Sequence, residues 1–171
     1  MDAANFLYHT PYGPIYGLIG TMGLQRLVLP DPDSPIRPYL LHSRPNHLLG
    51  RRLHALLEQY FAGVVTDFDE IPLETCGTAF QESVWQAVRA VPYGITVSYR
   101  DLAQSVSGAN AARAVGQALK RNPVPIVVPC HRVISASGGM GGFSAPIFWK
   151  KLLLDLEQGA RNLKTGQNQE S

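Results

Sequence analysis

The residues from Asn122 to Val133 carry the side chains of this chain that are best suited to nucleophilic chemistry. The segment reads Asn-Pro-Val-Pro-Ile-Val-Val-Pro-Cys-His-Arg-Val, so prolines restrict the backbone on the approach to Cys130. The thiolate is the reactive form of cysteine, and a free thiol with a pKa of about 8.5 needs a base or a positive environment to form it at neutral pH. Because His131 is the next residue, the pair predicts a nucleophilic cysteine that a histidine assists.

The relative placement of these groups can also be predicted. We expect an extended backbone at Cys130 and His131, where successive side chains point in opposite directions. A water bridging the thiol and the imidazole is then easier to place than a direct contact. A third group should orient the histidine. Glu157 is the candidate, because it lies at the edge of a predicted apolar helix face, whereas Asp155 points away from that face.

One other interpretation of Cys130 stays open on these residues alone. Cys130 could be a buried structural thiol, which is a common state of cysteine. A cysteine hydrolase has no support, because nothing around Cys130 matches a protease signature. Cys76 has neither a neighbouring histidine nor a proline frame, and we interpret it as a structural thiol.

The second half of the chain is predicted to hold helices around one short strand. Apolar spacing predicts helices over Phe80–Val91, Tyr99–Val106, Asn110–Lys120 and Trp149–Glu157. Ser98, with Asp101 three residues later, should cap the second of them. The segment Ile126–Val128 is short and β-branched, which favours a buried strand. The polar residues 160–171 predict a flexible tail.

The two middle helices, joined by a Gly-bearing turn, suggest a helix-turn-helix. In Asn110–Lys120 an inward stripe is expected at Val115, Ala118 and Leu119, and a second face carries Arg113, Gln117 and Lys120. The remaining positions are small (Ala111, Ala112, Ala114 and Gly116). Small residues permit close approach to a minor groove, and an arginine could fill the gap left by an extruded base. They equally suit packing against another helix.

The first half is predicted to be a small α+β unit without chemistry of its own. Strands are expected over Phe6–His9, Pro14–Thr21 and Leu24–Leu29, and a helix over His47–Phe61. A break near Glu74–Gly77 divides the chain into predicted domains 1–77 and 78–171. The first has five basic and eight acidic residues, a net charge of −3, and the second has ten and five, a net charge of +5. The C-terminal domain is therefore the candidate partner of a polyanion.

Composition excludes several classes of protein. The chain has 171 residues, a net charge of +2 and two cysteines, too few for a disulfide framework or a four-cysteine zinc site. No apolar run approaches the roughly 18 residues of a spanning helix, and the N-terminus lacks the pattern of a secretory signal. We therefore expect a cytoplasmic protein without a membrane partner.

Several motifs together resemble one family. Pro129-Cys130-His131-Arg132-Val133 looks like the active-site signature of the O6-alkylguanine-DNA alkyltransferases, or methylated-DNA–protein-cysteine methyltransferases. The resemblance covers roughly residues 78–157. It includes, in the same order, Phe80-Gln81, Pro92-Tyr93-Gly94, Ser98-Tyr99, Ala112–Gly116, Asn122–Pro125, Ser137-Gly138, Lys150 and Glu157. The first half resembles the family's ribonuclease-H-like domain more loosely, through Gly13-Pro14 and Gly23-Leu24.

The resemblance implies an α+β fold and a single-turnover enzyme of DNA repair. A small ribonuclease-H-like domain would precede a mainly helical domain with a winged-helix-like helix-turn-helix and the active-site cysteine. The alkyl group of O6-alkylguanine in duplex DNA would pass irreversibly to Cys130, after minor-groove binding and base flipping. O4-alkylthymine is a second candidate substrate. No cofactor and no metal are expected. We expect a monomer, and cooperative binding to DNA stays open.

The resemblance also implies roles for individual residues. Cys130 would accept the alkyl group, His131 would act as a base through a water, and Glu157 would hold His131. Tyr99 would help to rotate the nucleotide and deliver a proton, Arg113 would replace the flipped base, and Asn122 would brace the turn before Cys130. The pocket is expected at Val133, Phe143 and Ser144, and further DNA contacts are expected at Ala112, Ala114, Gly116, Gln117 and Lys120.

Two departures from the family pattern concern the pocket, and one alternative function remains. Phe143 stands where many relatives have tyrosine, which removes a hydroxyl. Ala145-Pro146 stands where relatives often have Gly-Gly, which stiffens the loop and bears on the alkyl groups it accepts. The alternative is a non-catalytic alkyl-damage sensor or a helix-turn-helix regulator. Cys130 separates the two, because the sensors have a different residue there.

Overall fold

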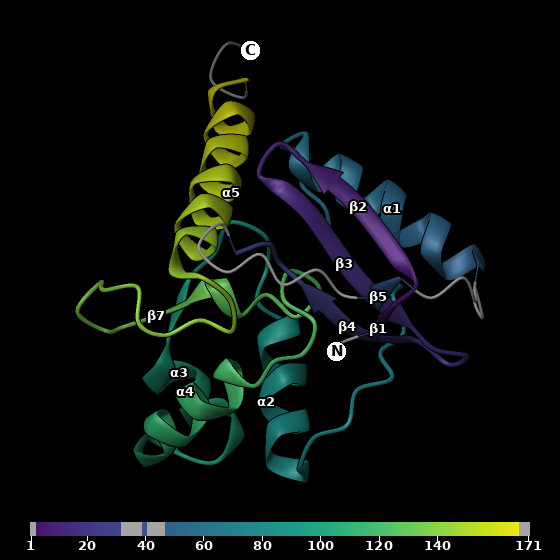
Figure 1. Cartoon of the computed structure of the whole chain (residues 1–171). Coiled ribbons are helices and arrows are strands. Elements are labelled where there is room, and N and C mark those ends of the chain that lie inside the picture. The colour runs from purple at the N-terminus through teal and green to yellow at the C-terminus, as the bar shows by residue number, and fades with distance from the viewer. Residues whose placement is uncertain (1–2, 32–38, 41–46, 168–171) are drawn as a thin grey trace.

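A three-stranded antiparallel sheet forms the first layer of the molecule. The computed structural model of the protein describes residues 3–31, 39–40 and 47–167. The sheet has the order β2-β3-β4, and its strands are β2 (Phe6–Thr10), β3 (Gly13–Ile19) and β4 (Leu24–Val28). Helix α1 (His47–Phe61) lies along one face of this sheet (Figure 1). The strands and the helix predicted here are confirmed to within two residues.

The inward stripe of α1 explains why this helix covers the sheet. Its buried residues are spaced three or four apart, at Leu49, Leu53, Leu57 and Tyr60. The alternating burial along β3, with Ile15 and Ile19 facing inward, supplies the matching sheet face. A short parallel pair, β1 (Ala3–Ala4) with β5 (Tyr39–Leu40), was not predicted, because two residues carry no detectable periodicity.

The second layer consists of α2 (Ala79–Arg89), α3 (Tyr99–Val106) and α4 (Ala112–Lys120), which contact one another below the sheet (Figure 1). The 3-10 turn η1 (Ala109–Ala111) precedes α4. Reciprocal capping boxes start α2 at Thr78 with Gln81, and α3 at Ser98 with Asp101. The predicted cap at Ser98 is confirmed, and so is the inward stripe of α4.

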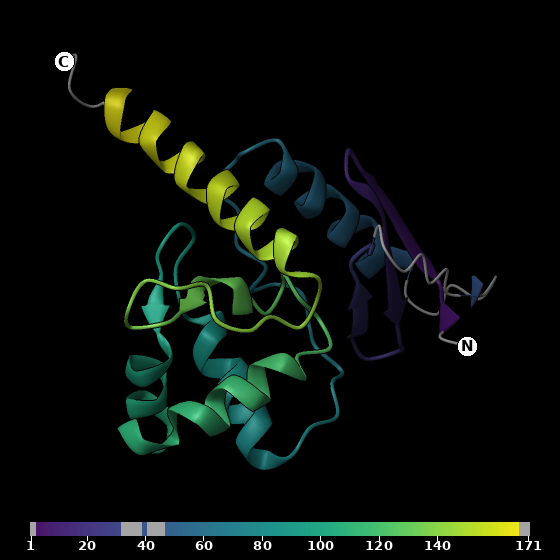
Figure 2. The same ribbon diagram turned by 60° about the vertical axis from the view of Figure 1, so that its left-hand side comes forward.

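The remaining elements connect the layers. Strands β6 (Val97–Ser98) and β7 (Val133–Ile134) form a parallel pair that joins the start of α3 to the chain just after Cys130. Helix α5 (Ile147–Gln167) lies above the helical layer (Figure 2), and Tyr60 near the end of α1 donates to its Glu157. The predicted end of α5 at Glu157 is wrong, since the helix continues to Gln167. The flexible tail predicted over residues 160–171 stays a prediction, and its residues 168–171 lie outside the part of the chain that the structure describes. Ala160 is buried, so packing carries the helix past Gly159.

Two local predictions around the cysteine segment are also wrong. Residues 126–128 are not a strand but part of a compact buried turn, in which Ile126 has φ 75°. The flanking prolines lack the N–H groups that a strand ladder needs, and the Asn122 side chain satisfies the turn instead. Cys130 and His131 are not extended, because Cys130–Arg132 forms the 3-10 turn η2.

The two halves of the chain share a single cluster of buried apolar side chains. The Leu27 N–H in the first half donates to the Pro123 carbonyl in the second at 2.8 Å. Trp149 Nε1 donates to the Pro30 carbonyl at 2.8 Å. The division into domains 1–77 and 78–171 therefore stays a prediction. In the part of the chain that the structure describes, every helix is too short or too polar to cross a membrane.

Candidate active site

The thiol of Cys130 lies at the end of the buried turn, and 2% of the residue is exposed. Asn122 Nδ2 donates to Cys130 Sγ at 3.1 Å, and Ser144 Oγ lies 3.4 Å from it. Burial raises the pKa of the thiol, while the bonds from Ser144 and Asn122 and the charge of Lys150 lower it. Because burial has the larger effect, the resting thiol is protonated and needs a base to become a nucleophile.

Asn122 also holds the turn in shape. Its Nδ2 donates to the Val128 carbonyl at 2.8 Å, and its Oδ1 accepts from the Val124 N–H at 3.0 Å. One buried amide thus satisfies two backbone groups and the sulfur. The position of the thiol is therefore coupled to the backbone of the turn.

Glu157 is the centre of a buried hydrogen-bond cluster. Its Oε1 lies 2.7 Å from His131 Nε2 and accepts from the Tyr60 hydroxyl at 2.7 Å. Arg132 donates through its NH2 group to Oε1 at 3.0 Å and through Nε to Oε2 at 3.0 Å. The N–H of Gly94 donates to Oε2 at 2.8 Å. Both carboxylate oxygens are thus fully occupied by donors.

The charge state of this cluster determines the tautomer of His131. Burial acts to raise the pKa of Glu157, but His131 and Arg132 outweigh it and lower the pKa to about 2. The carboxylate is therefore ionised at neutral pH, so Nε2 of His131 must carry the proton that points at it. Burial lowers the pKa of His131, which keeps the ring neutral. Its Nδ1 is then an acceptor, and it has no partner among the described residues.

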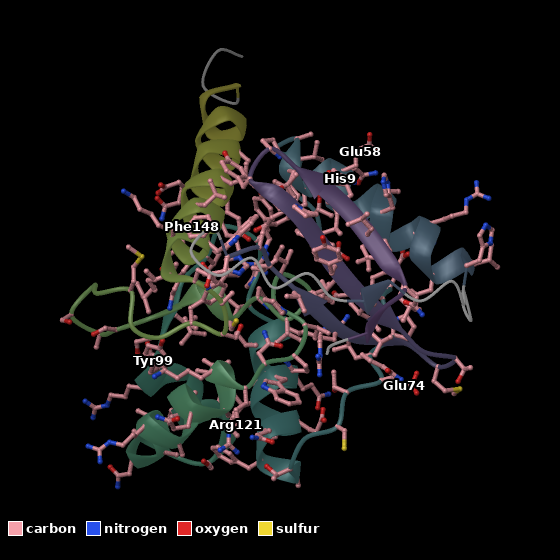
Figure 3. The ribbon with its side chains drawn as sticks, viewed as in Figure 1. His9, Glu58, Glu74, Tyr99, Arg121 and Phe148 are labelled. Atoms are coloured by element: carbon pink, nitrogen blue, oxygen red, sulfur yellow. The ribbon has the colours of Figure 1, made fainter. Side chains whose placement is uncertain are left out.

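Tyr99 and Lys150 fix the loop that leads into α5. The Tyr99 hydroxyl donates to the Gly142 carbonyl at 3.0 Å, and Lys150 Nζ donates to the carbonyls of Val133 at 2.6 Å and Gly142 at 3.1 Å. Figure 3 shows Tyr99 between α3 and this loop. Burial lowers the pKa of Lys150 to about 8. Gly141 has φ 64°, and a Cβ there would lie 2.6 Å from the Tyr99 ring, so glycine is required.

The outer face of α4 is separate from this buried cluster. Arg113, Gln117 and Lys120 are exposed on it, as predicted. An open groove is lined by Asn110, Ala112, Arg113, Ala114 and Gln117. Ala112 packs partly against the core, and a Cβ at Gly116 would lie 3.7 Å from the Tyr99 ring. The small residues therefore serve packing at some positions and an accessible helix surface at others.

The structure brings most of the predicted site residues together. Cys130, Asn122 and Ser144 meet at the sulfur, and His131 meets Glu157. Tyr99 and Val133 are joined through Lys150, and the half-buried Phe143 packs against the core. Arg113 lies apart, on α4. Cys76 is exposed, so its interpretation as a structural thiol is wrong. Its exposed side chain has no place in the core.

Sequence reasoning missed the contributions of Tyr60, Arg132 and Lys150. Arg132 follows His131 directly in the sequence. Because Glu157 was already expected to reach His131, an ion pair between Glu157 and Arg132 could have been predicted as well. Lys150 gave one signal, a charged residue between the apolar Trp149 and Leu152–Leu153. Tyr60 gave none, because it falls on the apolar stripe of α1 and is 97 residues from Glu157.

Sequence comparisons relate this chain to known proteins. Residues 79–159 match the family described as "6-O-methylguanine DNA methyltransferase, DNA binding domain". A methylated-DNA–protein-cysteine methyltransferase of Mycobacterium leprae is 52% identical over 102 residues, which are 60% of this chain and 61% of that protein. One from Methanosarcina acetivorans is 37% identical over 158 residues, which are 88% of this chain and 96% of that protein.

Solved structures show the same fold. The crystal structure of Mycobacterium tuberculosis OGT in complex with DNA superposes with a TM-score of 0.78 at 35% identity, covering 92% of this chain and 94% of that one. The chain is thus a mixed α/β protein of the same architecture. It belongs to the methylated-DNA–protein-cysteine methyltransferase family.

Proposed function

We propose that this protein repairs DNA by moving the alkyl group of O6-alkylguanine in duplex DNA directly and irreversibly to Cys130. The observation that carries the proposal is the buried thiol of Cys130 next to a neutral histidine whose Nδ1 has no partner among the described residues. The names of the family members support the substrate class and the cysteine as acceptor. No cofactor takes part in the proposed reaction.

The proposed chemistry uses the buried cluster in one sequence of steps. The Cys130 thiol passes its proton through a water to Nδ1 of His131, and Glu157 stabilises the imidazolium. The thiolate attacks the alkyl carbon, so that an S–C bond forms and the C–O6 bond breaks. Guanine leaves with the electron pair and takes a proton from the Tyr99 hydroxyl. Solvent then returns a proton to Tyr99 and removes one from His131, and the thioether remains on the protein.

Two features of Tyr99 support its role as a proton donor. Burial raises its pKa, so the hydroxyl stays protonated at neutral pH. Lys150 Nζ lies 3.4 Å from the hydroxyl oxygen and can stabilise negative charge that develops there. The guanine ring would be held near Val133, Phe143 and Ser144, in the family's pocket positions.

The proposed DNA-binding surface is the α3–η1–α4 unit, acting as a winged-helix-like helix-turn-helix. Its outer helix offers Arg113, Gln117 and Lys120 beside the exposed Ala114. This combination suits a minor groove, where small residues let the backbone approach closely and no base sequence has to be read. Arg113 would occupy the space of the extruded base. The first half of the chain is proposed to be ribonuclease-H-like.

The role of Arg113 leads to a selective prediction. Base extrusion costs a few kcal/mol, so losing the side chain that fills the gap should slow repair of duplex DNA by about 10- to 100-fold. Reaction of Arg113→Ala with a free O6-alkylguanine base should stay close to the wild-type rate. Single-turnover rates on both substrates measure this, with Arg51→Ala on α1 as the control. Equal losses on the two substrates would refute the role.

Stoichiometry tests the proposed function as a whole. Protein is mixed with an excess of duplex that carries one O6-methylguanine, and restored guanine is counted. We expect one repaired base per protein molecule, after which the reaction stops. Sustained turnover would contradict the proposal. Binding of the duplex without loss of the methyl group would favour the sensor. If phosphates contribute to binding, the affinity should fall as the salt concentration rises.

A further inference from the structure

The hydroxyl of Tyr60 reaches the proposed reactive centre from the first half of the chain. Tyr60 belongs to α1 and is fully buried. Its hydroxyl donates to Glu157 Oε1 at 2.7 Å, and the same oxygen lies 2.7 Å from His131 Nε2. The hydroxyl oxygen is itself 3.4 Å from that nitrogen. Polar groups from α1 and η2 therefore converge on one carboxylate oxygen of α5.

We propose that Tyr60 is a positioning residue for alkyl transfer, whose hydroxyl holds Glu157 Oε1 in place for His131. The first half of the chain then completes the reactive centre instead of only packing against it. This inference rests on the proposed function, because His131 matters as a base only if Cys130 takes up an alkyl group.

The hydroxyl of Tyr60 has a defined direction in this cluster. Burial and the neighbouring Glu157 raise the pKa of Tyr60 well above 10, so its oxygen always carries a proton. The proton points to Glu157, because His131 Nε2 is itself a donor to that carboxylate. Oε1 thus shares its negative charge among the phenol, the imidazole and the Arg132 guanidinium. Each additional donor on this oxygen, the phenol included, weakens the attraction of Glu157 for a protonated imidazole.

This sharing predicts an effect on the basicity of His131. The charged and titratable groups that act on the imidazole are Glu157, Arg132, Lys150 and Tyr60. Without the Tyr60 hydroxyl, the attraction of Glu157 for the imidazolium becomes stronger and the pKa of His131 rises. A larger share of His131 is then protonated at neutral pH and cannot accept a proton. The carboxylate also loses one of the donors that fix its orientation.

The ring of Tyr60 is held independently of its hydroxyl. It packs against Phe61, Phe68 and Tyr93 with centroid distances of 5.5, 5.7 and 5.7 Å. Tyr60→Phe should therefore keep the ring in place and remove only the hydrogen bond. Arg132, His131 and Gly94 still hold Glu157 in that variant, so the fold should persist.

Tyr93 provides a matched control beside the same cluster. Its ring stacks edge-on against Tyr60 and lies under Arg132, and its buried hydroxyl has no hydrogen-bond partner among the described residues. Tyr93→Phe makes the same chemical change a few ångströms away without removing a hydrogen bond. If Tyr60 only packed in the hydrophobic core, Tyr60→Phe and Tyr93→Phe would have the same effect on methyl transfer.

The test compares the pH dependence of single-turnover methyl transfer in wild type, Tyr60→Phe and Tyr93→Phe. We expect Tyr60→Phe to lower the plateau rate about tenfold and to move the acid limb of the profile to higher pH. Tyr93→Phe should follow the wild-type profile. Coincident profiles of the two variants, with the wild type active, would overturn the inference. An inactive wild type would instead overturn the proposed function.

A measurement on the wild-type protein makes the test independent of folding. A phenol bonded to a buried carboxylate gives a strongly downfield, slowly exchanging hydroxyl proton in the NMR spectrum. We expect such a signal, with a cross-peak to the His131 ring. Its absence at neutral pH would overturn the contact on which the inference stands.

Discussion

Glu157→Gln is expected to lower the free energy of unfolding by about 3–5 kcal/mol, because it leaves the buried Arg132 guanidinium without its counter-ion. A glutamine offers one acceptor oxygen, where the carboxylate accepts from Tyr60, His131, Arg132 and Gly94. For a chain of this size the loss corresponds to a melting temperature lower by roughly 10 °C. Urea unfolding measures it, with Asp155→Asn on the exposed face of α5 as the control.

The same substitution should slow methyl transfer by about 100-fold or more. An amide cannot stabilise the imidazolium of His131, and it no longer selects the tautomer with a free Nδ1. Single-turnover rates at temperatures where the variant is folded separate this effect from instability. A folded Glu157→Gln protein that transfers methyl at the wild-type rate would remove Glu157 from the account.

Acid unfolding tests the charge of Glu157 separately. Its pKa in the folded protein is about 2, below the ordinary value of 4.5. The unfolded state therefore binds a proton first as the pH falls, and the stability that this group provides above pH 4.5 is lost between pH 4.5 and 2. Glu157→Gln should lack this part of the pH dependence, whereas Asp155→Asn should retain it.

Lys150→Met is the second change with a large expected effect. The ammonium holds the carbonyls of Val133 and Gly142, and its positive charge favours the Cys130 thiolate. Without it, two buried carbonyls lose a donor and the pKa of the thiol rises. We expect methyl transfer at neutral pH to slow by about tenfold or more, since each unit of thiol pKa removes a factor of ten in thiolate.

The pH dependence of thiol alkylation by iodoacetamide reports the second effect directly. The alkylation profile of Cys130 should move to higher pH in Lys150→Met. Lys151→Met is the matched control, because the next residue carries the same charge on the exposed side of α5. Identical profiles in the two variants would show that Lys150 acts only as a structural bridge.

Local signals in the sequence predicted the regular elements well. The apolar spacing of α1 and the Ser98 cap of α3 need only neighbouring residues, and both agree with the structure. The prediction of a strand at Ile126–Val128, inside the turn at residues 122–129, was wrong for a physical reason. The β-branched residues of this turn favour a strand, but the prolines remove ladder donors and the Asn122 side chain takes their place. A side chain that makes the hydrogen bonds of the backbone produces no periodic pattern in the sequence.

The candidate site was predictable where its residues are close in sequence or carry a motif. Cys130, His131 and Glu157 were named from the motif and from helix geometry. The Tyr60 contact could not be predicted, because it joins two helices across 97 residues and follows only from their packing. The extent of α5 was missed for a similar reason. Tertiary burial of Ala160 outweighed the polar composition of the end of the chain.

The site of alkylation is the most direct measure of the central claim. After incubation with a duplex that contains O6-methylguanine, trypsin releases the peptide Asn122–Arg132, which contains Cys130 but not Cys76. We predict that this peptide gains the mass of one methylene group, that the fragment ions place it on Cys130, and that Cys130→Ala protein shows no gain anywhere. An unmodified peptide from folded protein with a free Cys130 thiol, or a methyl group found on Cys76, would contradict the account.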